Sequence, residues 1–260
     1  LFANTTANNN TAVGKSALAA NTTGPSNVAV GQEALAANTT ANNNTAVGRV
    51  AGSKTTTGCQ NVAIGTFAHC VNTTGINNVA IGVCSLCNNT TAEKNVAVGF
   101  QSLICNTTAA YNTAIGAGAL PVTTTGANNT GVGREVLFRN TIGAGNVSIG
   151  VLSGNTITTG DCNVMLGYRA IPSIADGQYQ LVLGAGDGND DMPGDGDNTI
   201  SIGKRTAHIT NTFTSNATWA HSSDLRYKKD IQNNTIGLDF INNLRTVNYK
   251  WKALSELDKT

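Results

Sequence analysis

Hydrophobic, small and polar positions recur along this chain with a 17-residue period. A glycine returns at that spacing without a slip, and each closes a variation on Asn-Val-Ala-Ile-Gly, which stands complete at residues 61–65. The series is Gly14, Gly31, Gly48, Gly65, Gly82, Gly99, Gly116, Gly133, Gly150, Gly167 and Gly184. A fixed short period is typical of one supersecondary unit stacked on copies of itself, so the repeat decides the fold.

Two apolar columns stand before these repeat glycines. The residue directly before the glycine is Val, Ile or Leu, and the residue three before it is Val, Thr or Leu. Residues two apart in a strand share a face, so the pattern predicts a short strand in every unit. The residue between the columns is Ala from Ala12 to Ala114 and points to the other side. Since solvent does not require alanine so consistently, we expect a second copy of the chain to cover the alanine column.

Polar turn residues complete the unit. Asn stands four residues before the repeat glycines from Gly14 to Gly167, and Gly or Ala stands ten residues after them, preceded by Thr-rich pairs such as Thr22-Thr23. Asn tolerates turns, and stacked copies can form a hydrogen-bonded ladder. No 3.6-residue apolar stripe is present, which argues against helices. The prediction is an all-β fold, a β-solenoid or β-roll with a 17-residue repeat, whose eleven coils span roughly 50 Å at about 4.8 Å per coil.

The period divides the chain into four segments. We expect a repeat shaft over 1–184, an irregular acidic terminal coil over 185–203, a β neck over 204–221 and a short α+β segment over 222–260. The next Ile-Gly after Gly184 comes two positions late for the repeat, at residues 202–203. Residues 204–221 lose the period but keep Thr, Ile and Phe, which favour strands.

Composition removes several function classes. Only 12% of residues are charged, 5% are aromatic and the net charge is +1, so the chain offers no basic field for nucleic acid. No apolar run is long enough to insert into a bilayer. Three histidines and the lack of a catalytic motif in the repeats argue against an enzymatic shaft.

The acidic coil contains a candidate calcium site. Asp187, Asn189 and Asp191 alternate as in a calcium-binding loop, and Asp195 and Asp197 could supply further oxygens. Met192 stands where such a loop has glycine, and no Glu closes the site. A solvated acidic turn is the alternative interpretation.

Four of the six cysteines are candidates for a cluster. Cys84 and Cys87 have the C-x-x-C spacing, Cys70 shares a column with Cys87, and Cys105 is one position off in the next coil. Plain buried thiols, a disulfide and a metal site are three alternatives for them.

The C-terminal segment carries a longer motif. It runs Ser-Ser-Asp-Leu-Arg-Tyr-Lys-Lys-Asp-Ile over residues 222–231, and Val-Asn-Tyr-Lys-Trp-Lys follows at 247–252. This order resembles the start of the peptidase S74 intramolecular chaperone domain, which ends many phage tail fibres and tailspikes. In that family the domain aids trimerisation and then cuts itself off. We therefore expect 222–260 to be a truncated chaperone segment and the chain to be a piece of a longer protein.

The resemblance implies a self-cleaving pair. By the family's motif, Ser223 is the nucleophile, Lys228 is its base, and Asp224 and Arg226 support them. A lysine with a lowered pKa can accept the hydroxyl proton. The expected scissile bond joins Ser222 and Ser223.

The repeats themselves resemble the head repeats of trimeric autotransporter adhesins and the repeats of tail-fibre-like phage proteins. Both likenesses imply a parallel homotrimer. We expect the shaft of a virion tail fibre, extracellular, that takes part in attachment to a host cell-surface receptor or glycan. A bacterial trimeric adhesin or other extracellular fibril is the first alternative. Two adjacent threonine columns, beginning at Thr22 and Thr23, leave an ice- or surface-binding solenoid as a remote one.

Overall fold

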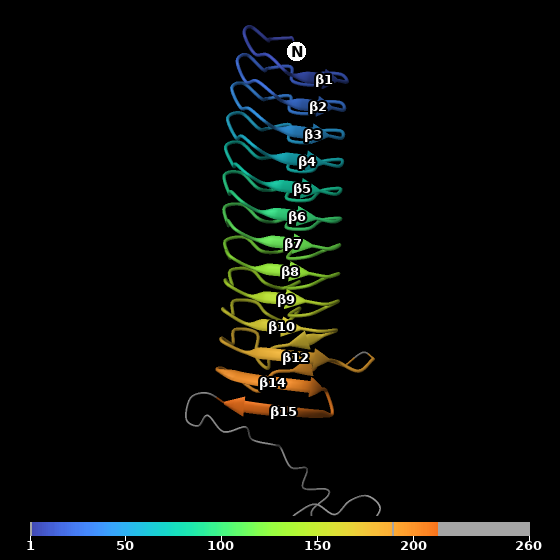
Figure 1. The fold of residues 1–260 in the computed structure, drawn as a ribbon, viewed down its shortest axis with the longest axis vertical. Coiled ribbons are helices and arrows are strands. Elements are labelled where there is room, and N and C mark those ends of the chain that lie inside the picture. The colour runs from blue at the N-terminus through green and yellow to red at the C-terminus, as the bar shows by residue number, and fades with distance from the viewer. Residues whose placement is uncertain (1, 189, 213–260) are drawn as a thin grey trace, which may run out of the picture. The chain divides into compact units, whose positions relative to one another are not determined.

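The computed structural model describes residues 2–188 and 190–212, which form a parallel β-solenoid of about eleven turns. Figure 1 shows one short strand in each coil, stacked above the strand of the next. The described residues contain strands and turns and no helix. This confirms the prediction of an all-β repeat solenoid. Within the same ranges, no helix of a length and hydropathy suited to crossing a membrane is found.

Fifteen strands make up this part of the chain. The first ten have three residues each: β1 (Thr11–Val13), β2 (Val28–Val30), β3 (Thr45–Val47), β4 (Val62–Ile64), β5 (Val79–Ile81), β6 (Val96–Val98), β7 (Thr113–Ile115), β8 (Thr130–Val132), β9 (Val147–Ile149) and β10 (Val164–Leu166). The others are β11 (Ala170–Ile171), β12 (Leu181–Ala185), β13 (Met192–Pro193), β14 (Thr199–Lys204) and β15 (Ala207–Thr212).

The strands join into one long ladder. Its order is β1 to β10, then β12, β14 and β15, and β11 pairs with β13 in a separate two-stranded sheet. All neighbours from β1 to β14 in the ladder are parallel, and up to β12 they pair 17 residues apart, as Val62 does with Val79, whereas β12 and β14 pair 19 residues apart. The acidic coil returns the chain to this ladder at β14, and β15 then pairs antiparallel with β14. The chain divides into two compact units, 1–222 and 223–260, and the second lies outside the described residues.

The repeat glycines are required by backbone geometry. From Gly14 to Gly167 their φ angles lie between +124° and +141°, a region that side chains rarely adopt. A Cβ added at Gly65 would lie 2.6 Å from the carbonyl oxygen of Gly82 in the next coil. Positive φ and close stacking act together, so no other residue fits this column.

The interior of each coil is filled by alanine from the strand and leucine from the following turn. Ala29, Ala46, Leu86 and Leu103 are fully buried in one continuous core. Our expectation that a second copy covers the alanine column is therefore wrong, because the chain's own core covers it. The middle residue of each three-residue strand points inward, and its two neighbours, β-branched in every such strand except for Leu166 of β10, point outward.

Departures from the repeat compensate one another in volume. Gly131 takes an alanine position, where a Cβ would lie 3.0 Å from the side chain of Val136, and Val136 in turn replaces the usual small residue of its own column. Gly154 takes a leucine position, and Ile157 stands three residues on, where most coils have Asn. Such paired changes keep the narrow core filled.

Buried asparagines hold successive coils together. The side-chain oxygen of Asn95 accepts the backbone N–H of Asn112 at 2.9 Å, and the side-chain nitrogen of Asn95 donates to the carbonyl of Ala109 at 2.9 Å. Asn78 stands in the same relation to Asn95 one coil earlier. A second column adds Asn106, which also donates to Ala109 at 3.0 Å. The predicted asparagine ladder is confirmed.

Candidate functional site

The outer face of the ladder is a distinctive surface of the described residues, and we call it the strand face. It consists of the two outward residues of each parallel strand, one and three residues before the repeat glycine. These are Thr11, Val13, Val28, Val30, Thr45, Val47, Val62, Ile64, Val79, Ile81, Val96, Val98, Thr113, Ile115, Thr130, Val132, Val147, Ile149, Val164, Leu166, Leu181, Leu183, Ile200 and Ile202. None of these residues is charged.

The strand face is extensive, and its residues are either exposed or half-buried. Val13 is 56% exposed, Ile115 39% and Ile149 44%, although each belongs to a strand. Twelve parallel strands at about 4.8 Å spacing, three residues wide, give a face about 50 Å long and about 10 Å across. Its area of about 500 Å² is at the upper end of the apolar patches that monomers expose. Such a face is typical of a protein–protein interface.

Residues at the adjoining corner enlarge this apolar surface. Val83, Phe100 and Tyr168 each follow a repeat glycine directly, and all three are exposed. In other coils the same column holds cations such as Arg49, whose guanidinium lies 4.4 Å from the ring centroid of Phe67. The charged groups therefore begin at the edge of the strand face.

The two threonine columns differ in environment. The hydroxyl of Thr22 donates to the carbonyl of Thr39 in the next coil at 3.1 Å, and Thr39 donates to Thr56 in the same way. The following residue, as at Thr23 and Thr40, is exposed. The second column is therefore the more exposed of the two, and ice or surface binding stays a remote alternative.

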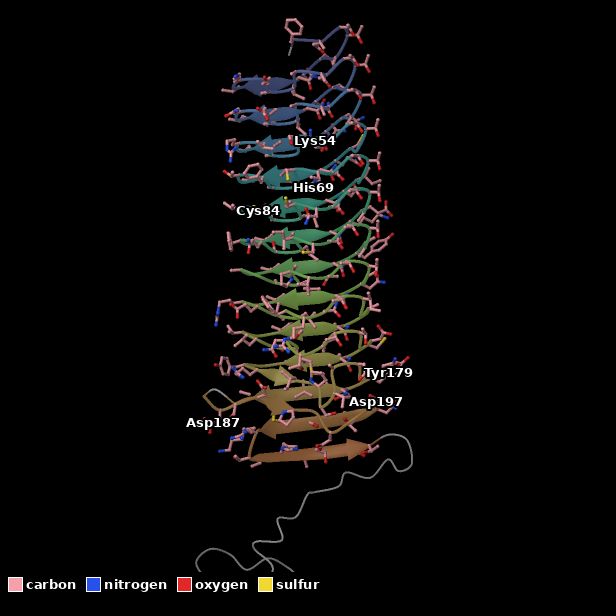
Figure 2. All side chains as sticks on the ribbon, turned by 180° about the vertical axis from the view of Figure 1, so that it is seen from behind. Lys54, His69, Cys84, Tyr179, Asp187 and Asp197 are labelled. Atoms are coloured by element: carbon pink, nitrogen blue, oxygen red, sulfur yellow. The ribbon has the colours of Figure 1, made fainter. Side chains whose placement is uncertain are left out.

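The acidic coil engages its carboxylates with separate partners. Asp191 accepts from Arg169 at 2.8 Å, and Asp190 pairs with Arg205 at 2.6 Å. The outermost candidates, Asp187 and Asp197, lie at opposite edges of the column in Figure 2. Within 2–188 and 190–212, no three His, Cys, Asp or Glu side chains gather closely enough to hold a metal ion.

The remaining calcium candidates behave in the same way. Asp195 lies 3.6 Å from His208, and Asp197 accepts the backbone N–H of Gln178 at 2.7 Å. Asn189 is outside the described residues. The calcium site stays a prediction.

The structure brings together two of the four clustered cysteines. The Sγ atoms of Cys70 and Cys87 lie 2.9 Å apart, while Cys84 and Cys105 are half-buried. All six thiols are free. Within the described residues, none of these thiols belongs to a group of three side chains that could hold a metal ion.

A buried histidine in the leucine column escaped the sequence reasoning. His69 is fully buried, its Nε2 lies 3.1 Å from the side-chain nitrogen of Asn89, and its Nδ1 has no hydrogen-bond partner within the described residues. Burial lowers the pKa of His69 to about 3, so it is neutral. The sequence does contain a sign of its burial, because His69 stands at a position of the repeat that holds Leu86 in the next coil.

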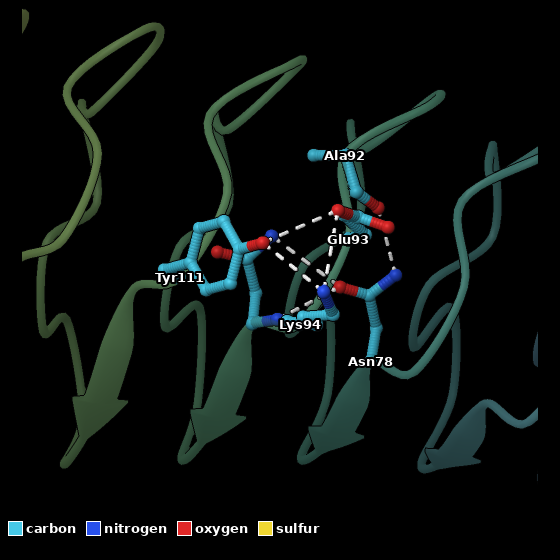
Figure 3. A network of polar contacts seen from close by, with 6 residues as sticks. Asn78, Ala92, Glu93, Lys94 and Tyr111 are labelled. Carbon is cyan, nitrogen blue, oxygen red and sulfur yellow. Dashed lines mark hydrogen bonds and ion pairs between the residues drawn. The ribbon is translucent and has the colours of Figure 1, made fainter.

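Figure 3 shows a small charged cluster on the outer surface. Lys94 donates to the hydroxyl of Tyr111 at 3.0 Å and pairs with Glu93 at 3.6 Å. The hydrogen bond to Tyr111 raises the pKa of Lys94. Because the cluster is exposed, we assign it no catalytic role.

Comparison with protein families finds a match for the C-terminal segment. Residues 223–260 match the Peptidase_S74 family, described as chaperone of endosialidase. No curated protein and no solved structure matches the chain. The proposed cleavage residues Ser223, Asp224, Arg226 and Lys228 fall within the matched segment, outside the described residues. The match supports the resemblance of the C-terminal motif.

Proposed function

We propose that this chain is the shaft of a phage tail-fibre or tailspike protein. One observation carries the proposal: a solenoid of about eleven coils is followed in the same chain by a segment that matches the chaperone of endosialidase. A stacked solenoid supplies length and stiffness without a catalytic cleft. The family segment supplies the link to assembly of tail proteins.

The partner of the strand face, in this proposal, is the same chain. Every copy has the same 17-residue period, so its rows of β-branched side chains repeat at the same spacing as the rows of a neighbour. Two such faces can therefore pack along their whole length without losing register. The absence of charge from the face removes the desolvation cost that buried charges would bring. We propose a parallel homotrimer, in keeping with the adhesin-like repeats.

In the same proposal the shaft is extracellular, part of the virion, and serves attachment to a host receptor or glycan. A bacterial trimeric adhesin built on the same solenoid is the competing function. Antibodies raised against the purified chain distinguish the two by immunogold electron microscopy. We expect gold on the tail fibres of phage particles. Labelling of bacterial cell surfaces, with none on particles, would replace our proposal by the adhesin.

The proposal includes at most one chemical step, which is self-cleavage between Ser222 and Ser223. The hydroxyl of Ser223 would attack the carbonyl carbon of Ser222, and Lys228 would accept the hydroxyl proton. Lys228 would pass that proton to the nitrogen of Ser223 as the C–N bond breaks, which leaves an ester between the two residues. Water would then hydrolyse the ester, leave a carboxyl group on Ser222 and the hydroxyl on Ser223, and release the shaft. Any cleavage at this bond should disappear in both Ser223→Ala and Lys228→Ala, as measured by intact mass, and persistence in either variant would remove the assigned pair.

A further inference from the structure

Two cysteines stack directly on each other between neighbouring coils. Cys70 and Cys87 are one repeat apart and occupy the same position of it. The backbone N–H of Val71 donates to the carbonyl of Cys87 at 3.2 Å, so the two coils are in contact at this place. Their Sγ atoms are 2.9 Å apart, so a shift of less than about 1 Å would bring them to the covalent S–S distance of about 2.05 Å.

No other pair among the six cysteines shares a column in adjacent coils. One repeat before Cys59 stands Asn42, and one repeat after it stands Ile76. Cys84, Cys105 and Cys162 likewise have other residue types one repeat away on either side. Coils about 4.8 Å apart fall inside the Cα–Cα range of about 4.4–6.8 Å that disulfides need. The geometry is therefore particular to Cys70 and Cys87.

We propose that Cys70 and Cys87 form an intrachain disulfide that staples two adjacent coils of the solenoid. The oxidant is a small disulfide such as oxidised glutathione. The Cys70 thiolate attacks one of its sulfurs, which forms a mixed disulfide and releases one glutathione. The sulfur of Cys87 loses its proton, attacks the Cys70 sulfur and releases the second glutathione. Two electrons and two protons pass from the cysteines to the two glutathione thiols.

The surroundings favour the first step of this exchange. The hydrogen bond between the two Sγ atoms lowers the pKa of the Cys70 thiol and raises the pKa of the Cys87 thiol. The thiolate, which is the reactive form, therefore resides on Cys70. Cys87 is the more exposed of the two and keeps the pair open to solvent at the surface of the coil.

The experiment maps free thiols in the full chain. No Lys or Arg lies between Lys54 and Lys94, so trypsin releases residues 55–94 as one peptide that contains Cys59, Cys70, Cys84 and Cys87. The chain is oxidised with glutathione disulfide, alkylated in denaturant and digested, and fragment spectra locate the alkyl groups. We expect alkyl groups on Cys59 and Cys84 only, and on all four after reduction. Alkylation of all four after oxidation, or a bond that includes Cys84 or a second chain, would overturn the assignment.

Two variants and a second readout complete the test. Cys87→Ser should leave Cys70 open to alkylation, whereas the matched Cys84→Ser should keep the Cys70–Cys87 bond. The thermal unfolding midpoint of the unsubstituted chain should be higher when oxidised than when reduced, because the bond closes a loop of one full repeat. That difference should vanish in Cys87→Ser. Equal midpoints for the oxidised and reduced chain would show that the bond is not a staple.

Discussion

At the residue scale, the repeat glycine is the position with the least freedom. Its positive φ angle is unfavourable for residues that carry a side chain. In addition, a Cβ at this position would collide with the carbonyl of the glycine in the next coil. Other left-handed positions of the coils accept side chains, among them Gln101 and Glu135, each two residues after its repeat glycine. The strict recurrence of glycine therefore reports close stacking as well as turn geometry.

Gly116 and Gly118 lie in one coil, and only Gly116 has the carbonyl of the next coil close by, so substitutions at the two distinguish the effect of close stacking from that of positive φ. Gly116→Ala should lower the free energy of unfolding by roughly 3 kcal/mol or more, since φ is +134° and a Cβ would lie 2.6 Å from the carbonyl carbon of Gly133. Gly118→Ala should cost only about 1 kcal/mol, because φ is +62° and the nearest atom is 3.6 Å away. Chemical denaturation of both variants measures the difference. Equal losses would contradict the stacking argument.

His69 makes stability depend on pH. Its pKa is about 3 in the folded state against 6.5 unfolded, so between these values the unfolded state binds more protons. Stability is therefore complete above about pH 6.5 and falls with decreasing pH, by up to about 1.4 kcal/mol per pH unit. His69→Leu, which restores the column's usual residue, should flatten this slope in denaturation curves from pH 7 to 4. His208→Gln, at a half-buried position, is the control and should keep it.

At the scale of the element, each coil is a three-residue strand joined by polar turns. The sequence predicts the strands, the turns and the asparagine ladder. Each of these positions recurs in coil after coil, and the same physical requirement acts on it every time. The side of the strand that faces the core could not be predicted in the same way. Alternation shows that Ala63 points away from Val62 and Ile64, but not which side the coil encloses. In a narrow coil, the leucine opposite leaves room only for alanine, so the larger residues lie outside.

The outliers at element scale were harder to predict. His69, Gly52 and Gly154 interrupt the leucine column, and single departures from a pattern do not reveal what fills the space. The acidic coil presents a different difficulty, since the spacing of its carboxylates predicts a calcium site but says nothing of their partners within the chain. Arg169 and Arg205 are distant in sequence from the acids they meet, and spacing alone does not reveal such partners.

The asparagine ladder should carry a measurable part of the stability. Asn95→Ala leaves the buried N–H of Asn112 without its acceptor and should cost about 2 kcal/mol or more. Asn88→Ala, at an exposed position of the preceding coil, should change stability by no more than about 0.5 kcal/mol. Urea denaturation compares the two. A small loss for Asn95→Ala would mean that the backbone ladder alone holds the coils.

At the scale of the whole molecule, the strand face connects the fold to the proposed function. If solvent covered every side of the solenoid, nothing in the fold would require two columns to stay free of charged residues over twelve strands. Burial of this face between copies would stabilise the assembly through the apolar area removed from water. The fold of the single coil does not require the face, so changes to it should separate assembly from folding.

Charges on the strand face test that separation. The double substitution Ile81→Lys and Ile115→Lys should dissociate the assembly while the circular dichroism spectrum stays unchanged, because both side chains already point outward. Thr74→Lys with Thr108→Lys adds the same charge to an exposed threonine column and should leave the assembly intact. Sedimentation velocity resolves the species. Dissociation of both double variants would assign the effect to net charge and not to the face.

The native mass of the unsubstituted chain tests the central proposal most directly. The chain has a mass of 26.7 kDa, and a trimer has three times that mass. Sedimentation equilibrium over a range of concentrations should give the trimer mass without dependence on loading. A mass of 26.7 kDa at every concentration would contradict the trimeric shaft and leave the strand face without the partner that we assign to it.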